Sequence, residues 1–527
     1  MAAKMILSVL LGGFVVLFLY LYESLVLKPK RLRSKLEKQG IRGPSPSSVL
    51  LGNIPEMKSI KLKVMKKSEE ARSSIKSKDH HLSIAHDWPS TIFPHLVQWT
   101  NEYGPIFMYS TGSIQLVSVT DIDMAKEVSL CTSLKLGKPA YLSKDRKPLL
   151  GQGILASNGP TWSHQRKIIA PEFYSDKVKG VVNLMVDSTT SMLRSWESKI
   201  ESEGGMAVFR VDEDLRSLSA DIISRTSFGS DYSQGKEIFL KLRTLQKAMS
   251  QLGNIGIPGL RYLPTKANRE IRRLEKDIHS MILRVANQRS TEATHEKDLL
   301  QMILEGAKKY DDADSLFSAG ISQEDFIVDN CKNIYFAGHE TTAITASWSL
   351  MLLAANPEWQ ARVRDEVLGI CGDGIPDADM LRSMKTLNMV IQETLRLYPP
   401  AVFVIRQALE DIKLKNILLP KGMNIQIPIP ILQRLPDLWG PDALDFNPKR
   451  FENGVLGACK FPQAYMPFGV GARVCLGQHL AMTELKVILS LILSKFSFSL
   501  SPAYQHCPAF RLVIEPENGV NLHVRRE

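Results

Sequence analysis

Apolar residues recur at helical spacing over most of the chain beyond Pro94. This amphipathic pattern predicts helices at residues 161–170, 178–201, 212–228, 236–252, 265–289, 323–355, 357–370 and 380–397. Short apolar or alternating runs predict strands at 106–109, 115–119, 403–408, 412–419 and 424–429, with more near the C-terminus. The chain is therefore predicted to be mainly α with small β-sheets.

The N-terminal segment follows a different pattern. Residues 5–22 contain no charge and are rich in Leu, Val and Phe. A helix of this length, rising about 1.5 Å per residue, nearly spans the hydrocarbon core of a bilayer. A cleaved signal peptide is the alternative, but the apolar run is long and no small-x-small site follows it. We expect residues 1–27 to be a retained, single-pass membrane anchor.

The net charge of +11 comes from one part of the chain. Residues 28–78 hold fifteen Lys or Arg against four Asp or Glu, and the rest of the chain holds 51 of each. The charge thus lies beside the membrane, where the positive-inside rule places everything downstream in the cytosol, and it does not support nucleic-acid binding. The six cysteines lack the spacing of a disulfide framework, which agrees with a reducing compartment.

The domain plan follows from these segments. Residues 28–60 are basic and then proline-rich around Pro44 and Pro46, which indicates a linker that is not helical at the prolines. No further linker divides the chain, so we expect one large domain at residues 61–527.

The run from Phe468 to Gly477 carries the strongest chemical signal, with the pattern F-x-x-G-x-R-x-C-x-G. Its glycines allow the backbone to approach a flat ligand. Cys475 would lie before a helix at 480–496, whose N-terminus favours a thiolate. No second cysteine stands at CxxC spacing, so a fifth ligand to haem iron suits Cys475 better than zinc or a disulfide. The alternative is a buried, inert cysteine.

A second motif, Ala-Gly-His-Glu-Thr-Thr at 337–342, lies inside the long helix predicted at 323–355. Glycine and threonines are unfavourable in the middle of a helix. The hydroxyl of Thr341 can bond back to the helix and leave a groove for oxygen and water. Glu340 could relay protons. The alternative is a Glu-Thr pair at a kink, and His339 faces either a pocket or the helix surface.

Other charged residues are ambiguous when taken singly. Glu393 and Arg396 lie on one helix face, as do many surface ion pairs. The same holds for the remaining candidates, which are Trp162, Arg166, Arg406, Arg450 and Arg473.

Together, in this order, the motifs resemble those of the cytochrome P-450 monooxygenases over roughly residues 40–525. The resemblance implies the cytochrome P-450 fold, with haem b ligated by the Cys475 thiolate in a loop that includes Phe468 and Gly469. It implies that Thr341 supports oxygen activation and that Glu340 helps deliver protons for O–O cleavage. Its cation and network positions would be Trp162, Arg166, Arg406 and Arg473 for the haem propionates and Glu393, Arg396 and Arg450 for a buried structural network.

The resemblance also implies a substrate pocket that includes Ala337, Gly338, Phe403, Val404 and Phe510. The sequence departs from the pattern at Gln433 and Leu435, where relatives often have His and Asp. Gln433 would then replace a histidine that usually contacts a propionate.

The chain has no flavin or dinucleotide fingerprint, so electrons from NADPH require a partner, NADPH–cytochrome P-450 reductase. The segment 496–510 resembles the plant branch that modifies gibberellins and related terpenoids. We expect an endoplasmic reticulum enzyme, with its catalytic domain in the cytosol, that hydroxylates or further oxidises a gibberellin-type diterpenoid or a pentacyclic triterpenoid. Open alternatives are a fatty acid or steroid substrate, a haem-thiolate isomerase or dehydratase that works without O2, and a non-catalytic haem sensor or carrier.

Overall fold

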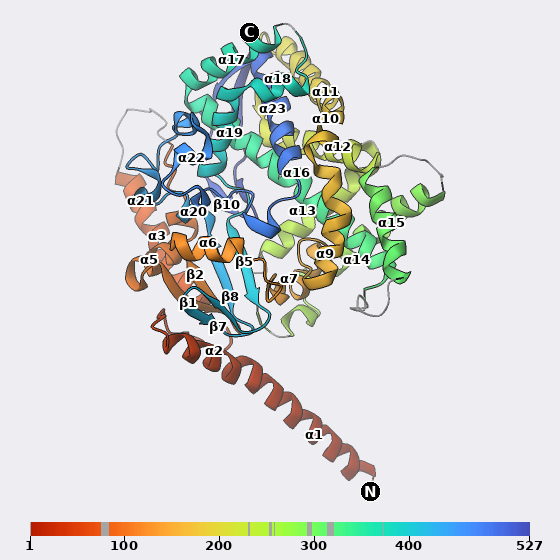
Figure 1. Cartoon of the computed structure of the whole chain (residues 1–527), viewed down its shortest axis with the longest axis vertical. Coiled ribbons are helices and arrows are strands. Elements are labelled where there is room, and N and C mark those ends of the chain that lie inside the picture. Colours follow the sequence, from red (N-terminus) through yellow and green to blue (C-terminus); the bar gives the residue numbers. More distant parts are fainter. Residues whose placement is uncertain are drawn as a thin grey trace.

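Long helices build most of the body (Figure 1). The computed structural model describes residues 2–74, 84–229, 232–251, 256–257, 259–291, 298–312, 321–372 and 374–527. The predicted helices are present as α9 (Gly159–Ile169), α11 (Val182–Ser202), α12 (Val211–Phe228), α13 (Tyr232–Gln251), α14 (Lys266–Thr291), α16 (Gln323–Ala355), α17 (Pro357–Cys371) and α19 (Lys385–Leu397). The segment predicted at 380–397 is interrupted at Met384, which separates α18 (Ala378–Ser383) from α19.

Further helices complete the described chain. The longer ones are α3 (Ile54–Ser74), α5 (Pro94–Tyr103), α6 (Ile122–Leu130), α15 (Leu299–Asp312) and α23 (Gln478–Lys495). The shorter ones are α4 (Pro89–Ile92), α7 (Ala140–Lys144), α8 (Lys147–Leu150), α10 (Ser175–Gly180), α20 (Ile429–Leu432), α21 (Pro436–Trp439) and α22 (Gly454–Ala458).

The strands form small sheets, as the sequence predicted. The largest has the order β1 (Ile106–Thr111), β2 (Ile114–Val119), β8 (Asn424–Pro428), β5 (Phe403–Ala408), β3 (Leu136–Gly137). In this sheet β2 and β8 are parallel, and the other neighbours are antiparallel. The run predicted as one strand at 412–419 is a hairpin of β6 (Ile412–Leu414) and β7 (Ile417–Leu419), because Lys415 turns the chain with a positive φ of 48°.

The other strands come largely from the C-terminal end. β4 (Met206–Arg210), β12 (Asn521–Arg526) and β9 (Phe496–Leu500) make a three-stranded sheet in that order. β10 (Pro508–Phe510) and β11 (Ile514–Pro516) form a hairpin.

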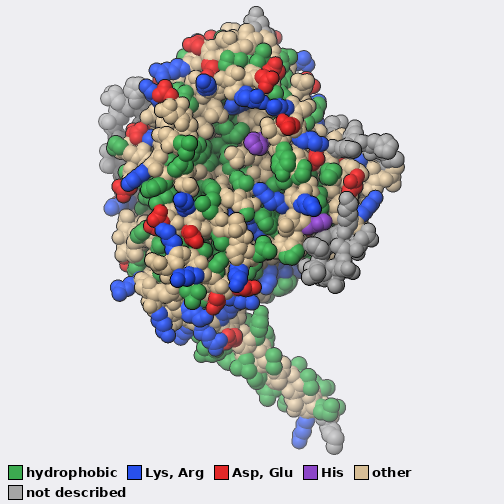
Figure 2. All heavy atoms as spheres, in the orientation of Figure 1, with side chains coloured by type: hydrophobic (Ala, Val, Ile, Leu, Met, Phe, Trp, Pro, Cys, Tyr) green, Lys and Arg blue, Asp and Glu red, His purple; other side chains and the backbone are tan. Residues whose placement is uncertain are grey.

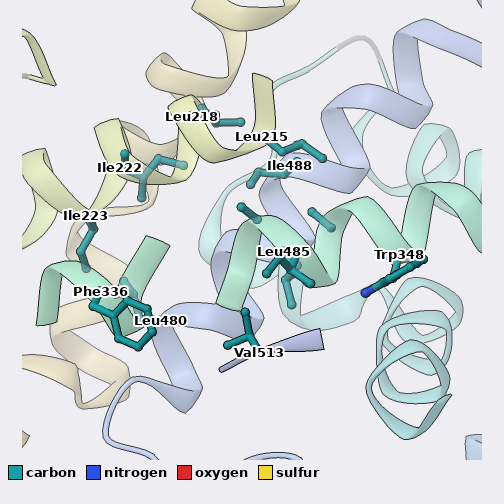
Figure 3. Packing of buried hydrophobic residues seen from close by; sticks show 14 of the residues in the cluster. Leu215, Leu218, Ile222, Ile223, Phe336, Trp348, Leu480, Leu485, Ile488 and Val513 are labelled. Carbon is teal, nitrogen blue, oxygen red and sulfur yellow. The ribbon is translucent and has the colours of Figure 1, made fainter. Parts of the chain in front are cut away.

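Helix α16 runs through the middle of the core (Figure 1). Figure 3 shows Leu215 and Ile222 of α12, Trp348 of α16, and Leu485 and Ile488 of α23 packed in one cluster. Fully burying such an aliphatic side chain stabilises the fold by about 1.5–3 kcal/mol. The three helices therefore form a rigid frame, and any group on α16 or just before α23 is held in a fixed place.

The N-terminal helix α1 (Ala2–Tyr22) projects from this body, with its apolar side chains exposed (Figures 1 and 2). It continues through Glu23–Leu27 into α2 (Lys28–Glu37), and the combined helix is long and apolar enough to cross a membrane. Lys and Arg side chains gather where this helix joins the body (Figure 2).

The segment that we expected to be a linker, 28–60, packs against the domain. Leu32 and Leu36 of α2 and Ile41 belong to a core cluster with the large sheet. The Arg42 carbonyl accepts a hydrogen bond from the Met108 amide at the edge of that sheet. The basic segment is therefore built into the fold, because its leucines bury an apolar face that α2 alone could not cover.

Candidate active site

A cavity of about 310 Å³ lies between α16 and the loop that precedes α23. Cys475 is on its wall, and so are Ala337, Gly338 and Thr341 of α16. Phe403 and Val404 of β5 complete the expected lining, but Phe510 does not reach it. Phe510 is 37% exposed and packs behind Phe403, with ring centroids 6.0 Å apart. The structure thus brings the two strongest motifs together and corrects one expected pocket residue.

The cysteine loop is closed by its own backbone. The Cys475 amide donates to the Phe468 carbonyl over 2.8 Å, and Gly471 has a φ of 80°. A Cβ on Gly471 would lie 2.2 Å from the Ser129 carbonyl oxygen, so only glycine lets this loop pass α6. The Cys475 side chain is open to the cavity.

The environment alone does not activate the Cys475 thiol. Burial raises its pKa, and this effect exceeds the opposing contributions from a backbone hydrogen bond at Gly477 and from Arg166. We expected the following helix to favour a thiolate, but desolvation outweighs it here. A coordinated metal deprotonates a thiol directly, so an iron ligand remains consistent with this site.

The threonines of α16 bond back to their own helix. Thr341 Oγ1 donates to the Ala337 carbonyl over 2.8 Å, and Thr345 Oγ1 donates to the Thr341 carbonyl over 2.8 Å. Gly338 serves packing as well as access to the cavity, because a Cβ there would lie 2.7 Å from Ile223 of α12.

Glu340 lies on the opposite face of α16 from this cavity. Its side chain is completely buried and forms ion pairs with Arg216 (3.2 Å) and Arg243 (2.8 Å). Burial would raise the pKa of Glu340, but these guanidinium groups reverse the effect and hold it below its ordinary value. Both arginines also pair with Glu515.

This ion-pair cluster borders a second cavity, of about 370 Å³, which His339 also lines. The His339 Nδ1 atom lies 2.5 Å from the Tyr335 carbonyl oxygen, and its ring meets Phe239 edge-on. His339 is therefore buried on the charged side of α16 and does not line the cavity of Cys475.

Four cations approach the cavity without a carboxylate partner in the described part of the chain: Lys138, Arg166, Arg406 and Arg473. Arg406 is 6% exposed and donates only to its neighbour's carbonyl, and burial lowers its pKa to about 10. Burial also lowers the pKa of Arg473 to about 10 and that of Lys138 well below its ordinary value. Buried cations without anions are costly, so the site is built to receive negative groups.

The cations are oriented as a set. Arg473 stacks on Trp162 at 4.2 Å from the ring centroid and donates to Ser157 and Asn158. Arg166 donates to the Val474 carbonyl over 3.1 Å. Carboxylates of a flat ligand that reaches Cys475 would meet this set, so the donors fit haem with its two propionates. No motif marks Lys138, and the sequence analysis missed it.

Comparison with known proteins agrees with this geometry. The family model described as Cytochrome P450 matches residues 80–523. The chain belongs to the cytochrome P450 family.

This P450 is similar along its whole length to plant relatives. It is 54% identical to Cytochrome P450 714C2 of Oryza sativa subsp. japonica, an alignment that covers 97% of this chain and 96% of the relative. It is 47% identical to Cytochrome P450 714B3 of Zea mays, over 99% and 96%, and 45% identical to Cytochrome P450 714A2 of Arabidopsis thaliana, over 96% and 95%.

Family membership fixes the class of chemistry. The protein is a monooxygenase that uses haem with a cysteine thiolate ligand and takes electrons from a reductase partner. The exposed N-terminal helix fits the membrane anchor of such enzymes.

Behind the cysteine loop of this P450, Glu393 and Arg396 form a fully buried bidentate pair with two 2.7 Å contacts. Arg450 Nε approaches Glu393 at 3.7 Å. Arg396 also donates to the Ala443 carbonyl, which ties α19 to the chain before the cysteine loop. The three expected network residues therefore come together.

Gln433 belongs to this support and not to the cavity. Its Nε2 donates to the carbonyls of Leu395 and Arg396, and its Oε1 accepts from the Met466 amide. The expected propionate contact is absent because the side chain is spent on backbone groups. Leu435 likewise packs in the hydrophobic core and does not line the cavity.

The sequence analysis missed several wall residues for which no motif exists. The aliphatic and aromatic ones are Ile154, Leu155, Phe173, Ile223, Ile334 and Leu480. Glu484 of α23 is a polar exception: it accepts a 2.6 Å hydrogen bond from Ser219, and burial raises its pKa to about 8. It is therefore mostly neutral at pH 7 and adds little charge to this wall.

Proposed function

We propose that this P450 hydroxylates, or oxidises further, a terpenoid of the gibberellin-type diterpenoid or pentacyclic triterpenoid class. The observation that carries the proposal is the apolar cavity with Cys475 on one wall and Thr341 on another. Such walls recognise a substrate by shape and buried apolar area. The resemblance of segment 496–510 to the gibberellin-modifying plant branch is the reason for choosing terpenoids among apolar classes.

Each site residue has a role in this proposal. Haem, when bound, supplies oxidation by O2 with electrons that originate from NADPH. Cys475 holds the iron through its sulfur, and Arg166, Arg406, Arg473 and Lys138 neutralise the propionates. Trp162 orients Arg473 by stacking.

Proton delivery is the proposed role of Thr341 and Glu340. Thr341 Oγ1 lines the cavity and can donate its proton there when its bond to the Ala337 carbonyl is released. Glu340, on the other face of α16, borders the charged cavity and is the nearest acid in sequence from which that hydroxyl could be reprotonated.

We also propose that the protein resides in the endoplasmic reticulum membrane with its catalytic body in the cytosol. The basic residues that follow α1 support this orientation, because cytosolic flanks carry an excess of Lys and Arg.

The test is turnover in microsomes that contain the protein, NADPH–cytochrome P-450 reductase and NADPH, with and without oxygen. Gibberellin-type diterpenoid acids and pentacyclic triterpenoid acids should give oxygenated products only in air, and Cys475→Ala should give none. Turnover of fatty acids or sterols alone would overturn the terpenoid assignment. Product formed without oxygen would instead favour the isomerase or dehydratase alternative.

A further inference from the structure

The segment Gly151–Ser157, between α8 and α9, forms part of the cavity wall without being a helix or a strand. Its Ile154 and Leu155 line the cavity. A wall of this kind has little regular backbone hydrogen bonding, so its position depends on what else binds its N–H and C=O groups.

Helix α16 supplies those partners through side chains. Asp329 Oδ2 accepts from the Gln152 amide over 2.7 Å, and Asn330 Oδ1 accepts from the Ile154 amide over 3.1 Å. Asn333 binds the segment twice: its Oδ1 accepts from the Leu155 amide and its Nδ2 donates to the Leu150 carbonyl, both over 2.9 Å. All three side chains are buried, so water does not readily replace them.

The fit is close as well as polar. Gly151 has a φ of 55°, and a Cβ there would lie 2.0 Å from the Asp329 carboxylate. A Cβ on Gly153 would lie 2.6 Å from the Asp329 carbonyl oxygen. Both glycines therefore let the segment lie directly on α16.

The far side of the segment is held too. Gln165 of α9 donates to the Gln152 carbonyl over 3.0 Å, and Arg473 of the cysteine loop donates to the Ser157 carbonyl over 3.1 Å. The wall is thus fixed between α16, α9 and the loop of Cys475.

Asn333, Ala337 and Thr341 follow one another at intervals of four residues along α16, which places them on one helix face. The face that presents Thr341 to the cavity therefore also holds Leu155. The separation between the oxygen-side threonine and the wall is set by one rigid element.

We propose that Asp329, Asn330 and Asn333 are positioning residues that hold Ile154 and Leu155 as a fixed wall and so set which molecules, by size, fit before Cys475. This rests on the proposed function only in treating the cavity as the substrate site. Selectivity by a hydrophobic wall changes strongly when the wall moves, because packed surfaces tolerate little displacement.

The test uses the full-length, haem-loaded protein and needs no substrate. Three probes of increasing size, imidazole, 4-phenylimidazole and 4-(biphenyl-4-yl)imidazole, are titrated and followed by the Soret shift on nitrogen coordination. Hydrogen exchange of the amides of residues 152–155 is measured in parallel. In Asn333→Ala we expect exchange at least tenfold faster and a change of at least fivefold in the Kd ratio between the smallest and largest probes.

Gln360→Ala is the matched control. Gln360 is also buried and also binds a backbone twice, donating to the Phe498 carbonyl and accepting from its amide, but it does not line the cavity. It should leave both the exchange of 152–155 and the probe ratio at wild-type values. Leu155→Ala, which removes the wall side chain itself, should shift the ratio in the same direction as Asn333→Ala.

Two results would overturn the proposal. Faster exchange with an unchanged probe ratio would mean that these residues only stabilise the fold, and unchanged exchange would mean that they do not hold the segment. If Asn333→Ala fails to load haem, Asn330→Ala, which removes only the bond to Ile154, is judged by the same ratio. A failure of the terpenoid assignment would leave these measurements unaffected.

Discussion

The carboxylate of Glu340 lies 2.8 Å from the guanidinium of Arg243, so the acid that precedes Thr341 is bound to α13 on the side of α16 away from Cys475. Arg216 of α12 forms the second ion pair of the same carboxylate. One buried charge therefore links α12, α13 and α16 while it stands beside the oxygen-side threonine.

Arg243→Gln should destabilise the protein by about 3 kcal/mol, because it leaves a buried carboxylate with one cation in place of two. The midpoint of urea unfolding in detergent, followed by circular dichroism, measures this loss. Arg273→Gln is the control, since Arg273 pairs with Glu270 on an exposed helix face and its removal should leave the midpoint unchanged. Equal losses in the two variants would contradict the structural weight given to Arg243.

Thr341→Ala should release more hydrogen peroxide per NADPH consumed, because the hydroxyl that faces the cavity is lost. Peroxide yield against NADPH consumption in the reductase-coupled enzyme measures this coupling. Thr226→Ala removes an equivalent back-bonded hydroxyl, which donates to the Ile222 carbonyl over 2.7 Å on α12, and should leave coupling unchanged. Wild-type coupling in Thr341→Ala would refute the proton-delivery role.

Arg406→Met should weaken haem retention without destabilising the haem-free protein. A buried cation with no carboxylate partner among the described residues costs stability until an anion arrives, whereas methionine carries no such cost. Haem transfer to apomyoglobin should be about tenfold faster, as expected for one lost charge-assisted hydrogen bond.

Arg434→Met is the matched control for that experiment. Arg434 is also buried, but it donates to the carbonyls of His86 and Pro430 and does not line the cavity. It should lower stability and leave haem transfer unchanged. A haem-free Arg406→Met protein less stable than wild type would contradict the assignment.

Stability should fall as the pH drops from about 6.5 toward 4. The His86 and His506 rings both lie against the Tyr398 hydroxyl, at 2.8 and 3.1 Å, and His506 also lies 2.9 Å from the Tyr504 hydroxyl. Burial lowers the pKa of His86 to about 3, with Arg434 adding to the effect, and lowers that of His506 to about 4.

Above pH 6.5 both rings are neutral whether the chain is folded or unfolded, so their full contribution to stability is present there. Below it the unfolded chain binds protons that the folded protein refuses, which costs about 1.4 kcal/mol per pH unit for each ring. Urea midpoints at pH 7 and pH 5 measure the slope, and His86→Gln or His506→Gln should reduce it. An unchanged slope would contradict the neutral state of these rings.

Deletion of residues 2–27 should release the protein from membranes and leave haem binding intact, because α1 is exposed along its length. Deletion of residues 2–37 should also destabilise the fold, since it removes the buried Leu32 and Leu36. Losing two such side chains costs roughly 4–8 kcal/mol. Sedimentation with microsomes and the ferrous–CO spectrum of each form give the two readouts.

The sequence predicted most of the fold because helical periodicity is a local property. The helices from α9 to α17 lie near their predicted positions, and only short-range features such as the break at Met384 and the turn at Lys415 escaped the pattern. The motifs around Cys475 and Thr341 were equally local, and the cavity that joins them agrees with both.

What the pattern could not give was direction. Glu340 and Thr341 are neighbours in sequence, but successive residues of a helix point about 100° apart, so one lines the cavity and the other meets Arg243. Phe510 and Gln433 were placed in the site by resemblance, and packing against Phe403 and backbone bonds beside Arg396 took them out of it.

The sequence by itself determined the membrane anchor, the helical fold and the cysteine and threonine that define the chemistry, because spacing along the chain encodes all of these. Only the tertiary structure decided that Lys138 joins the cations of the cavity and that Asn333 holds Leu155 in its wall. These relationships join residues far apart in the chain. They exist only once packing has fixed the helices against one another.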